Sequence, residues 1–185
     1  MRIILLSERN PRDMNKGTLY FFTGLAGAGK STIGGLFYRR LCEKKENVYL
    51  WDGDQRRAAG EGAGRSSYST EARREGAKYV FRRCLEMTEQ GTDVVCCIIG
   101  MYDDVRAWNR AHFANYKEIY IKVSMETLYR RDQKGLYSSG AKEVVGVDLP
   151  WDEPKTPDVV IENDGGETPE AIVERLEKLF GLSEG

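Results

Sequence analysis

The sequence is poor in the residues that build metal centres and catalytic triads. It contains one histidine, His112, and four cysteines, Cys42, Cys84, Cys96 and Cys97. A single histidine cannot anchor a metal cluster or a triad on its own, and the cysteines lack the spacing of metal ligands. Cys96 and Cys97 lie within the apolar run DVVCCIIG, where small buried thiols are expected. Unpaired cysteines of this kind predict a protein of the reducing cytoplasm.

Long apolar runs and an excess of one sign of charge are also missing. No apolar run approaches the roughly 20 residues of a membrane span, and the beginning, MRIILLSERNPRDMNK, has too short an apolar core for a signal peptide. Lys and Arg number 28 and Asp and Glu 29, a formal net charge of -1 that argues against a nucleic-acid partner. With 185 residues, of which 41% are hydrophobic, the chain is expected to form one domain that binds neither a membrane nor a nucleic acid.

Glycine, by contrast, is frequent, and several glycines form a motif. The stretch GLAGAGKST, from Gly24 to Thr32, fits the template Gly-x-x-x-x-Gly-Lys-Ser/Thr. The apolar run TLYFFT precedes it as a buried strand would, and STIGGLFYRRLCEKK follows it with apolar residues three and four apart, as in a helix. A strand, a glycine turn and a helix start are the context of a P-loop, although a glycine-rich turn that binds nothing has the same outline.

A P-loop binds the phosphates of a nucleoside triphosphate. Its glycines let the backbone curl so that successive N–H groups point at a phosphate, and the helix N-terminus adds partial positive charge. Lys30 is expected to reach the β- and γ-phosphates, and the Ser31 hydroxyl to coordinate Mg²⁺. The predicted nucleotide-binding residues of this loop are Gly24, Ala26, Gly27, Ala28, Gly29, Lys30, Ser31 and Thr32.

Strand-like and helix-like segments alternate along the rest of the chain. After 18–23, strands are predicted at 47–54, 92–100, 117–123 and 157–164, with a long helix from Ser69 or Thr70 to Gly91 and an amphipathic helix at 168–181. This alternation predicts an α/β fold with a parallel five-stranded sheet that helices cover on both faces. Residues 1–16 precede the sheet as an N-terminal arm, and 17–185 are expected to form a single domain.

Ligands of such sheets bind beyond the carboxyl ends of the strands, so GLAGAGKS, the DGD of LWDGDQRR and IIGMYDD should converge there. The Asn-Lys-x-Asp of GTPases is absent, and Asp103 and Asp104 come late for the acidic residue of a motor ATPase. A small-molecule kinase fits better, because its carboxylate takes the proton of an acceptor hydroxyl or helps to hold Mg²⁺. Asp52 and Asp54 alternate along the strand end, so only one is expected to be the base; two solvated turn aspartates are the alternative.

A cation-rich segment, YRRDQKGLYSSGAKE at 129–143, begins on a predicted helix and continues into a Gly/Ser loop. Arg130, Arg131 and Lys134 are expected to belong to a lid, at about 130–147, that covers the transferred phosphoryl group and excludes water. The alternative for this segment taken by itself is a solvated charged surface.

The order of the motifs resembles that of the adenylylsulfate kinase family. GLAGAGKST is followed by DGDQRR, YSTEAR, RDQKGLY and VVGVDLPWDEPKTPDVVI, over roughly 17–163. The resemblance implies the P-loop fold of nucleotide kinases. It also implies transfer of the γ-phosphate of MgATP to the ribose 3′-hydroxyl of adenylylsulfate, a small-molecule nucleotide substrate.

The same resemblance implies roles for single residues. Asp54 becomes the base, assisted by Lys30 and Asp52, and Ser31 and Asp52 are the candidate ligands of Mg²⁺. Which of the two aspartates contacts the metal is left open. The further residues implied to contact the nucleotides are Arg131 for ATP and, for the acceptor, Asp54, Arg57, Tyr68, Arg73, Lys134 and Val144.

The acceptor half of the family pattern is altered in this sequence. Residues 76–79 replace an Asn-x-Arg-Arg, and Asp103 of GMYDDVRAWNR takes the place of an anion-binding arginine. Val144 of VVGVD replaces an aromatic ring that would stack on adenine, which valine cannot do. These stretches are similar to those of a family branch that phosphorylates CDP-phosphoramidate in surface-polysaccharide pathways. Adenylylsulfate and CDP-phosphoramidate both remain as acceptors.

Two other functions are weighed against this one. A regulatory module that binds ATP without turnover would have lost the base, yet Asp52 and Asp54 are both present with Lys30. A kinase of another small molecule, such as a sugar, is disfavoured by Arg57 and Arg73, which suit an anionic acceptor. The sequence leaves a homodimer open.

Overall fold

The computed structural model describes residues 16–58, 70–132, 135, 137 and 144–182. Nearly all of the predicted arm and much of the predicted lid lie outside these residues, as do Tyr68 and Lys134. The backbone of Arg57 lies on a described helix, but the structure does not describe its side chain. The roles expected of these three side chains therefore stay predictions.

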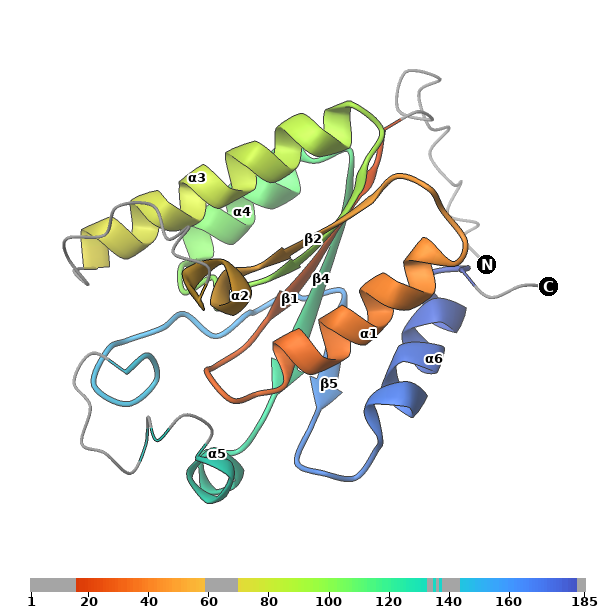
Figure 1. Cartoon of the computed structure of the whole chain (residues 1–185). Helices are drawn as coiled ribbons and strands as arrows, with labels where there is room; N and C mark the ends of the chain where they lie inside the picture. Colours follow the sequence, from red (N-terminus) through yellow and green to blue (C-terminus); the bar gives the residue numbers. More distant parts are fainter. Residues whose placement is uncertain (1–15, 59–69, 133–134, 136, 138–143, 183–185) are drawn as a thin grey trace, which may run out of the picture.

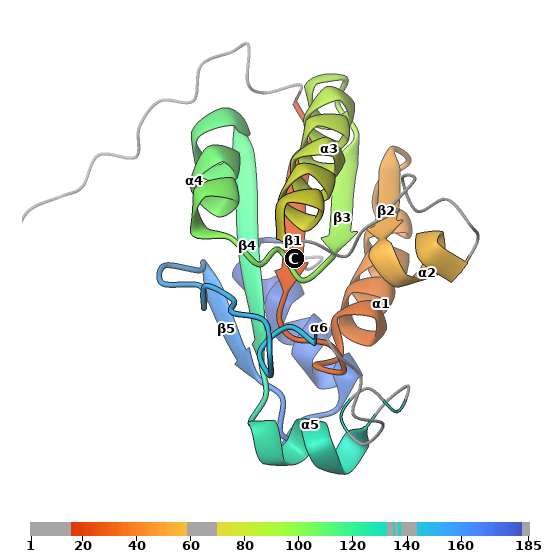
Figure 2. The same cartoon turned by 90° about the vertical axis from the view of Figure 1, so that its left-hand side faces the viewer.

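Five parallel strands form one sheet in the order β2-β3-β1-β4-β5 (Figure 1). The strands are β1 (Thr18–Thr23), β2 (Val48–Asp52), β3 (Asp93–Cys97), β4 (Asn115–Lys122) and β5 (Val159–Glu162). The helices are α1 (Lys30–Cys42), α2 (Gly53–Ala58), α3 (Thr70–Glu89), α4 (Asp103–His112), α5 (Met125–Arg131) and α6 (Pro169–Leu179). Helices α1 and α6 cover one face of the sheet and α3 and α4 the other (Figure 2), so the predicted architecture is confirmed.

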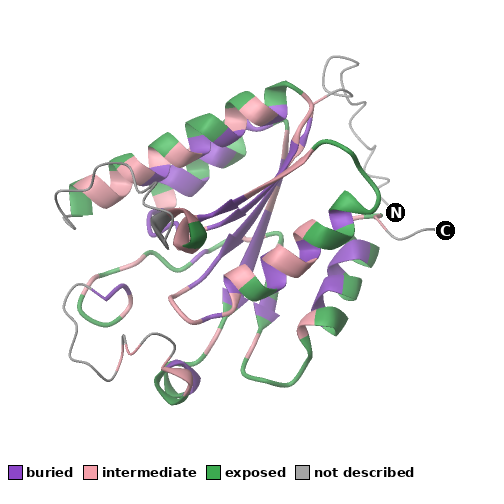
Figure 3. Cartoon of the chain, in the orientation of Figure 1, coloured by how far each residue is buried: buried purple, intermediate pink, exposed green. Residues whose placement is uncertain are grey.

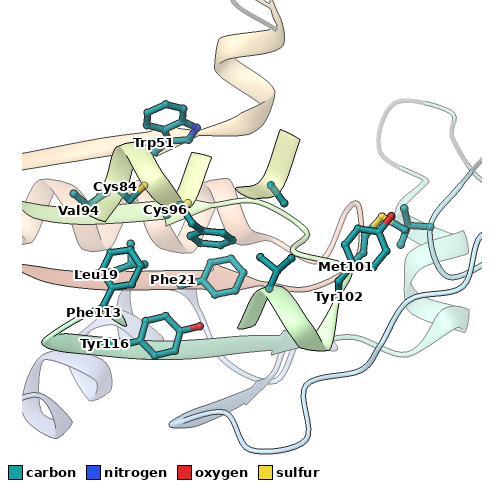
Figure 4. Packing of buried hydrophobic residues seen from close by; sticks show 14 residues of the cluster. Leu19, Phe21, Trp51, Cys84, Val94, Cys96, Met101, Tyr102, Phe113 and Tyr116 are labelled. Atoms are coloured by element: carbon teal, nitrogen blue, oxygen red, sulfur yellow. The ribbon is translucent and has the colours of Figure 1, made fainter. Parts of the chain in front are cut away.

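Alternate side chains of β1 enter two hydrophobic cores, one on each face of the sheet. Leu19 and Phe21 lie in the core under α3 and α4 (Figure 4). There Phe21 meets Phe81 edge to face, with ring centroids 5.0 Å apart. Tyr20 and Phe22 lie in the core under α1 and α6. The central strands β1 and β3 are accordingly almost wholly buried, as are the sides of the helices that face the sheet (Figure 3). Full burial of one phenylalanine stabilises the fold by roughly 1.5–3 kcal/mol.

β2 ends two residues earlier than predicted, and α2 and α4 are absent from the prediction. Oδ1 of Asp52 accepts the N–H groups of Asp54 at 2.8 Å and Gln55 at 3.0 Å, so the chain turns into α2 instead of staying extended. A carboxylate at this position is a favourable N-terminal cap. α4 escapes prediction because it buries the polar Arg106 and Asn109 beside Val105, which weakens its apolar pattern.

Within the part of the chain that is described, no helix is both long and apolar enough to cross a membrane.

Two adjacent glycines of α1 give opposite predictions for stability. A Cβ on Gly34 would lie 2.3 Å from Sγ of Cys97 on β3, whereas nothing lies within 4 Å of a Cβ on Gly35. Gly34→Ala is expected to destabilise the fold by about 1–3 kcal/mol, because the helix and the sheet must separate. Gly35→Ala is expected to stabilise it by about 0.5–1 kcal/mol, because alanine loses less backbone entropy in a helix. Urea denaturation measures both changes, and equal effects would contradict the close packing of α1 on β3.

Candidate active site

The turn between β1 and α1 has the backbone of a phosphate-binding loop. Gly24, Gly27 and Gly29 have φ values of 143°, 76° and 103°, which side-chain-bearing residues rarely adopt. A Cβ on Gly24 would lie 2.4 Å from the carbonyl oxygen of Ile121 on β4, so only glycine fits there. The first N–H groups of a helix have no partner within the helix, and those of α1 open toward this turn. The loop can therefore present several N–H groups to one anion.

Lys30 lies across this turn rather than pointing away from it. Its side chain is buried, and Nζ donates a hydrogen bond to the carbonyl oxygen of Leu25 at 2.8 Å. The carbonyl oxygen of Lys30 itself accepts from Sγ of Cys97 at 3.5 Å, which joins the start of α1 to the end of β3. Burial, together with the charge of Asp52, raises the pKa of the Cys97 thiol, which therefore stays a neutral donor. Ser31 follows, half-buried, at the next position of α1.

Asp52 and Asp54 lie at the carboxyl end of β2, next to the end of β3. Asp52 is buried and pairs in register with Cys97. Its Oδ1 caps α2, while its Oδ2 is buried without a hydrogen-bond partner among the described residues. Asp54 is half-buried in the first turn of α2. The two carboxylates thus have different surroundings, and Asp52 is not a solvated turn aspartate.

Magnesium fits the chemistry of these residues. Mg²⁺ takes oxygen ligands and usually keeps several waters and the phosphates of a substrate. The unpartnered Oδ2 of Asp52 and the hydroxyl of Ser31 are oxygen donors of this kind. The described residues contain no group of three or more His, Cys, Asp or Glu side chains that could hold a metal ion. A magnesium ion held by such residues would take its other ligands from phosphate oxygens and water.

The start of α3 borders the loop that follows β3. The Tyr102 hydroxyl donates to the carbonyl oxygen of Thr70 at 2.7 Å, and the Arg74 guanidinium lies 4.5 Å from the centre of the Tyr102 ring. Burial raises the pKa of Tyr102, and the nearby charges of Arg74 and Arg73 oppose that shift. The charge of Arg73, an expected acceptor-binding residue, thus acts on Tyr102, the residue before α4.

Val144 begins a turn that packs against the P-loop. The turn closes through a hydrogen bond from the Gly146 N–H to the carbonyl oxygen of Leu149 at 2.8 Å. A Cβ on Gly146 would lie 2.7 Å from the Leu25 side chain. Val144 is buried, and the next residue, Val145, belongs to the core cluster that includes Met101 and Tyr102, both labelled in Figure 4. The turn that begins at Val144 therefore approaches the P-loop at Leu25, and Val144 itself is aliphatic and buried.

Asp103 is the centre of a charged cluster at the start of α4. Its Oδ1 accepts from Nη2 of Arg106, and its Oδ2 accepts from Nζ of Lys155 at 2.6 Å. Its own N–H donates to Oδ2 of Asp152 at 3.0 Å. The hydrogen bonds from Lys155 and Arg106 lower the pKa of Asp103, and Asp103 raises the pKa of Lys155. Because 35% of the Asp103 side chain and 78% of the Lys155 side chain are exposed, an ionised acceptor and a charged donor stand side by side within reach of a ligand.

Two side chains that the sequence analysis does not single out reach the P-loop. The Tyr137 hydroxyl donates to the carbonyl oxygen of Ala26 at 2.7 Å, and Nδ2 of Asn163 donates to that of Ala28 at 2.8 Å. Arg131, for which contact with ATP stays a prediction, donates to the carbonyl oxygen of Asn163 at 2.6 Å. Asn163 lies at the carboxyl end of a predicted strand, a position that the sequence indicates as part of the ligand-binding edge of the sheet. No spacing in the sequence indicates that Tyr137 contacts Ala26.

Comparison with known proteins agrees with this geometry. The sequence model of the family described as adenylylsulphate kinase matches residues 16–162. The cytidine diphosphoramidate kinase of Campylobacter jejuni is 36% identical over 172 residues, which cover 91% of this chain and 99% of that protein. The probable adenylyl-sulfate kinase of Bacillus subtilis is 30% identical over 167 residues, which cover 86% and 83%.

A solved structure shows the same fold. The APS kinase CysC of Mycobacterium tuberculosis, solved in complex with AMPPNP and APS, superimposes with a TM-score of 0.79 at 26% sequence identity. The superposition covers 90% of this chain and 98% of the other.

Replacement of Gly24 is expected to weaken nucleotide binding. In Gly24→Ala the new Cβ meets the Ile121 carbonyl oxygen, so the turn must leave its seat on β4. A strained backbone of this kind costs on the order of 1–3 kcal/mol, so the Kd for AMPPNP should rise about 5- to 150-fold in calorimetry. The matched control is Gly166→Ala, where nothing lies within 4 Å of the new Cβ and binding should not change. Equal affinities of the two variants would contradict the seating of the turn.

Proposed function

This chain belongs to the adenylylsulphate kinase family, and we propose that it phosphorylates the ribose 3′-hydroxyl of a cytidine diphosphate conjugate of the phosphoramidate type. The expected resemblance to the family is confirmed, and the chain is an ATP-dependent phosphotransferase that acts on a nucleotide. A regulatory module without turnover is not favoured, because the matched relatives are kinases. The relatives differ in the acceptor that their names state, which is cytidine diphosphoramidate for one and adenylyl sulfate for the other.

The ATP half of the reaction is supported by the seated P-loop and its cation. We assign Lys30 to the β- and γ-phosphates, and Ser31 and Asp52 to Mg²⁺, which would neutralise charge that develops on the phosphates. The oxygen of the acceptor hydroxyl attacks the γ-phosphorus of ATP, and Asp54 accepts the proton of that hydroxyl. The bond between the γ-phosphorus and the β–γ bridging oxygen breaks, which releases ADP. Asp54 is the better candidate for the base, because its side chain is more exposed than that of Asp52. In addition, one carboxylate oxygen of Asp52 already accepts the N–H groups at the start of α2.

One observation carries the choice of acceptor: the carboxylate of Asp103 with Lys155 beside it. The sulfate end of adenylylsulfate has only oxygen acceptors, which a carboxylate repels. A phosphoramidate end has an N–H donor next to an anionic oxygen, so Asp103 can accept from the nitrogen while Lys155 donates to the oxygen. The ionised state of both side chains suits this pairing.

The surface at Val144 supports the same acceptor. An adenine ring gains much of its affinity from stacking between aromatic side chains, which valine cannot provide. Cytosine has one ring instead of two and so less surface to stack. The buried Val144 beside Val145 offers an aliphatic contact that depends less on ring area.

We extend the proposal to the organisation of the chain. Residues 17–185 form one kinase domain with an arm at 1–16, and the cations Arg130 and Arg131 at the end of α5 begin the lid. The reaction belongs in the cytoplasm, where its donor ATP is available.

The experiment that tests the acceptor measures ADP release by the purified protein with MgATP and CDP-phosphoramidate, adenylylsulfate or no acceptor. Turnover with CDP-phosphoramidate, and a much lower kcat/KM with adenylylsulfate, is expected. The reverse order would make the chain a sulfate-activating enzyme in which Asp103 and Val144 are tolerated. Tight ATP binding without turnover on either acceptor would contradict both substrates.

Asp54→Asn is expected to lower turnover by a factor on the order of 10² or more, because asparagine cannot take the proton of the attacking hydroxyl. The α2 cap should persist, since it uses the backbone N–H of residue 54. Calorimetric affinity for AMPPNP serves as the control and should stay unchanged. If turnover is retained, Asp54 is not the base.

Asp103→Asn is expected to relax the choice of acceptor. The variant loses the charge that repels sulfate while it keeps the size of the side chain. A hydrogen bond to a charged group contributes about 1.5–3 kcal/mol, so the ratio of kcat/KM for CDP-phosphoramidate to that for adenylylsulfate should fall about tenfold or more. Asp104→Asn, which changes the neighbouring carboxylate, provides the control and should leave the ratio unchanged. An unchanged ratio in both variants would remove Asp103 from acceptor recognition.

A further inference from the structure

Three carbonyl oxygens of the P-loop accept hydrogen bonds from side chains, and two of these side chains lie outside the loop. Leu25 accepts from Lys30, Ala26 from the Tyr137 hydroxyl at 2.7 Å, and Ala28 from Nδ2 of Asn163 at 2.8 Å. Only the first of these donors belongs to the P-loop template. The other two come from the segment after α5 and from the end of β5.

These bonds decide where the N–H groups of the loop point. Within one trans peptide unit the C=O and the following N–H point in opposite directions, and every described peptide bond here is trans. A bond that holds the Ala26 carbonyl on one side therefore turns the Gly27 N–H to the other side. The Asn163 bond to Ala28 does the same for the Gly29 N–H. Glycines have the largest conformational freedom of all residues, so a loop this rich in glycine gains most from such external restraint.

Asn163 is itself fixed from two sides. Its backbone N–H donates to the carbonyl oxygen of Lys122 at the end of β4 at 2.8 Å, and its carbonyl oxygen accepts from Arg131 at 2.6 Å. A Cβ on Gly29 would lie 2.7 Å from Nδ2 of Asn163, so the amide can approach the loop only because residue 29 is glycine. The side chain is thus a rigid link between the sheet, the end of α5 and the phosphate-binding turn.

Tyr137 is fixed in a similar way. Its N–H donates to Oδ1 of Asp132 at 2.9 Å, and its ring lies 5.2 Å from the ring of Tyr129, centroid to centroid. Burial raises the pKa of Tyr137, with the neighbouring Tyr129 and Asp132 acting in the same direction, so its hydroxyl stays a hydrogen-bond donor. Its chain position, 111 residues from Ala26, makes the contact a product of the tertiary fold.

We propose that Asn163 and Tyr137 are positioning residues for ATP, which aim the N–H groups of Gly27 and Gly29 at the phosphates by holding the carbonyl groups of Ala26 and Ala28. The inference concerns the ATP half of the site and does not depend on which nucleotide is the acceptor. It predicts a loss of affinity for ATP that leaves the acceptor's KM unchanged.

The test compares Asn163→Ala, Asn163→Asp and Tyr137→Phe in the full-length protein. Each variant removes one hydrogen bond to the loop, and Asn163→Asp keeps the size of the side chain while it has no N–H to donate. One such bond corresponds to about 0.5–1.5 kcal/mol, so Asn163→Ala and Tyr137→Phe should each raise the Kd for AMPPNP and the KM for ATP about two- to tenfold. Asn163→Asp should raise both further, because its carboxylate also repels the phosphates. Calorimetry gives the Kd without any acceptor, so its result is separate from the choice of acceptor.

Asn115→Ala is the matched control. It removes a bond of the same type, from an asparagine Nδ2 to the carbonyl oxygen of Lys16 at 3.1 Å, at the opposite end of β4. Its Kd for AMPPNP should equal that of the unmodified protein. An unchanged Kd in Asn163→Asp overturns the inference for Asn163, because the shape of the side chain and not its donor would then matter. An unchanged Kd in Tyr137→Phe, or a parallel rise in the acceptor's KM, overturns it for Tyr137.

Discussion

The close seating of the β1–α1 turn on its neighbouring strands is the constraint on which this site depends. The carbonyl oxygen of Ile121 and the sulfur of Cys97 approach Gly24 and Gly34 so closely that no side chain fits between them. Because β1, β3 and β2 are adjacent and parallel, the same seating brings the charges of Lys30 and Asp52 to opposite sides of one electrostatic balance, in which both act on the Cys97 thiol. The two hydrophobic cores and the outer strands β2 and β5 hold the β1–α1 turn and its neighbouring strands in place.

The site that we propose has two halves, which would recognise their ligands by different physical means. The P-loop half uses backbone dipoles, a helix start and one buried ammonium group, which suit the phosphates of any nucleotide. For the acceptor half, we propose an aliphatic contact at Val144 and the ion pair between Asp103 and Lys155. Aliphatic contact and a paired donor and acceptor distinguish one nucleotide conjugate from another.

The parts of this structure that follow from local pattern are the parts that the sequence predicts. Buried strand runs, the glycine template and the carboxylates after β2 are short-range signals, and the sheet and the phosphate loop agree with them. The helix start after Asp52 depends on one side-chain cap, which a six-residue helix without an apolar face does not reveal. The contacts of Tyr137 and Asn163 with the loop join residues 111 and 135 positions apart. Such pairs follow from how segments pack, and no local propensity encodes them.

The separation of the two halves has a consequence for how enzymes of this kind diversify. The side chains that contact the P-loop carbonyls come from α1, the segment after α5 and the end of β5, whereas Asp103 and Val144 lie on other segments. A duplicated gene can therefore acquire a new acceptor through point substitutions at the second set while its donor chemistry is inherited intact. Leu25 is the exception, because it belongs to the P-loop and also packs against Gly146. Substitutions there are expected to be rare in any such lineage, since one change would alter both halves at once.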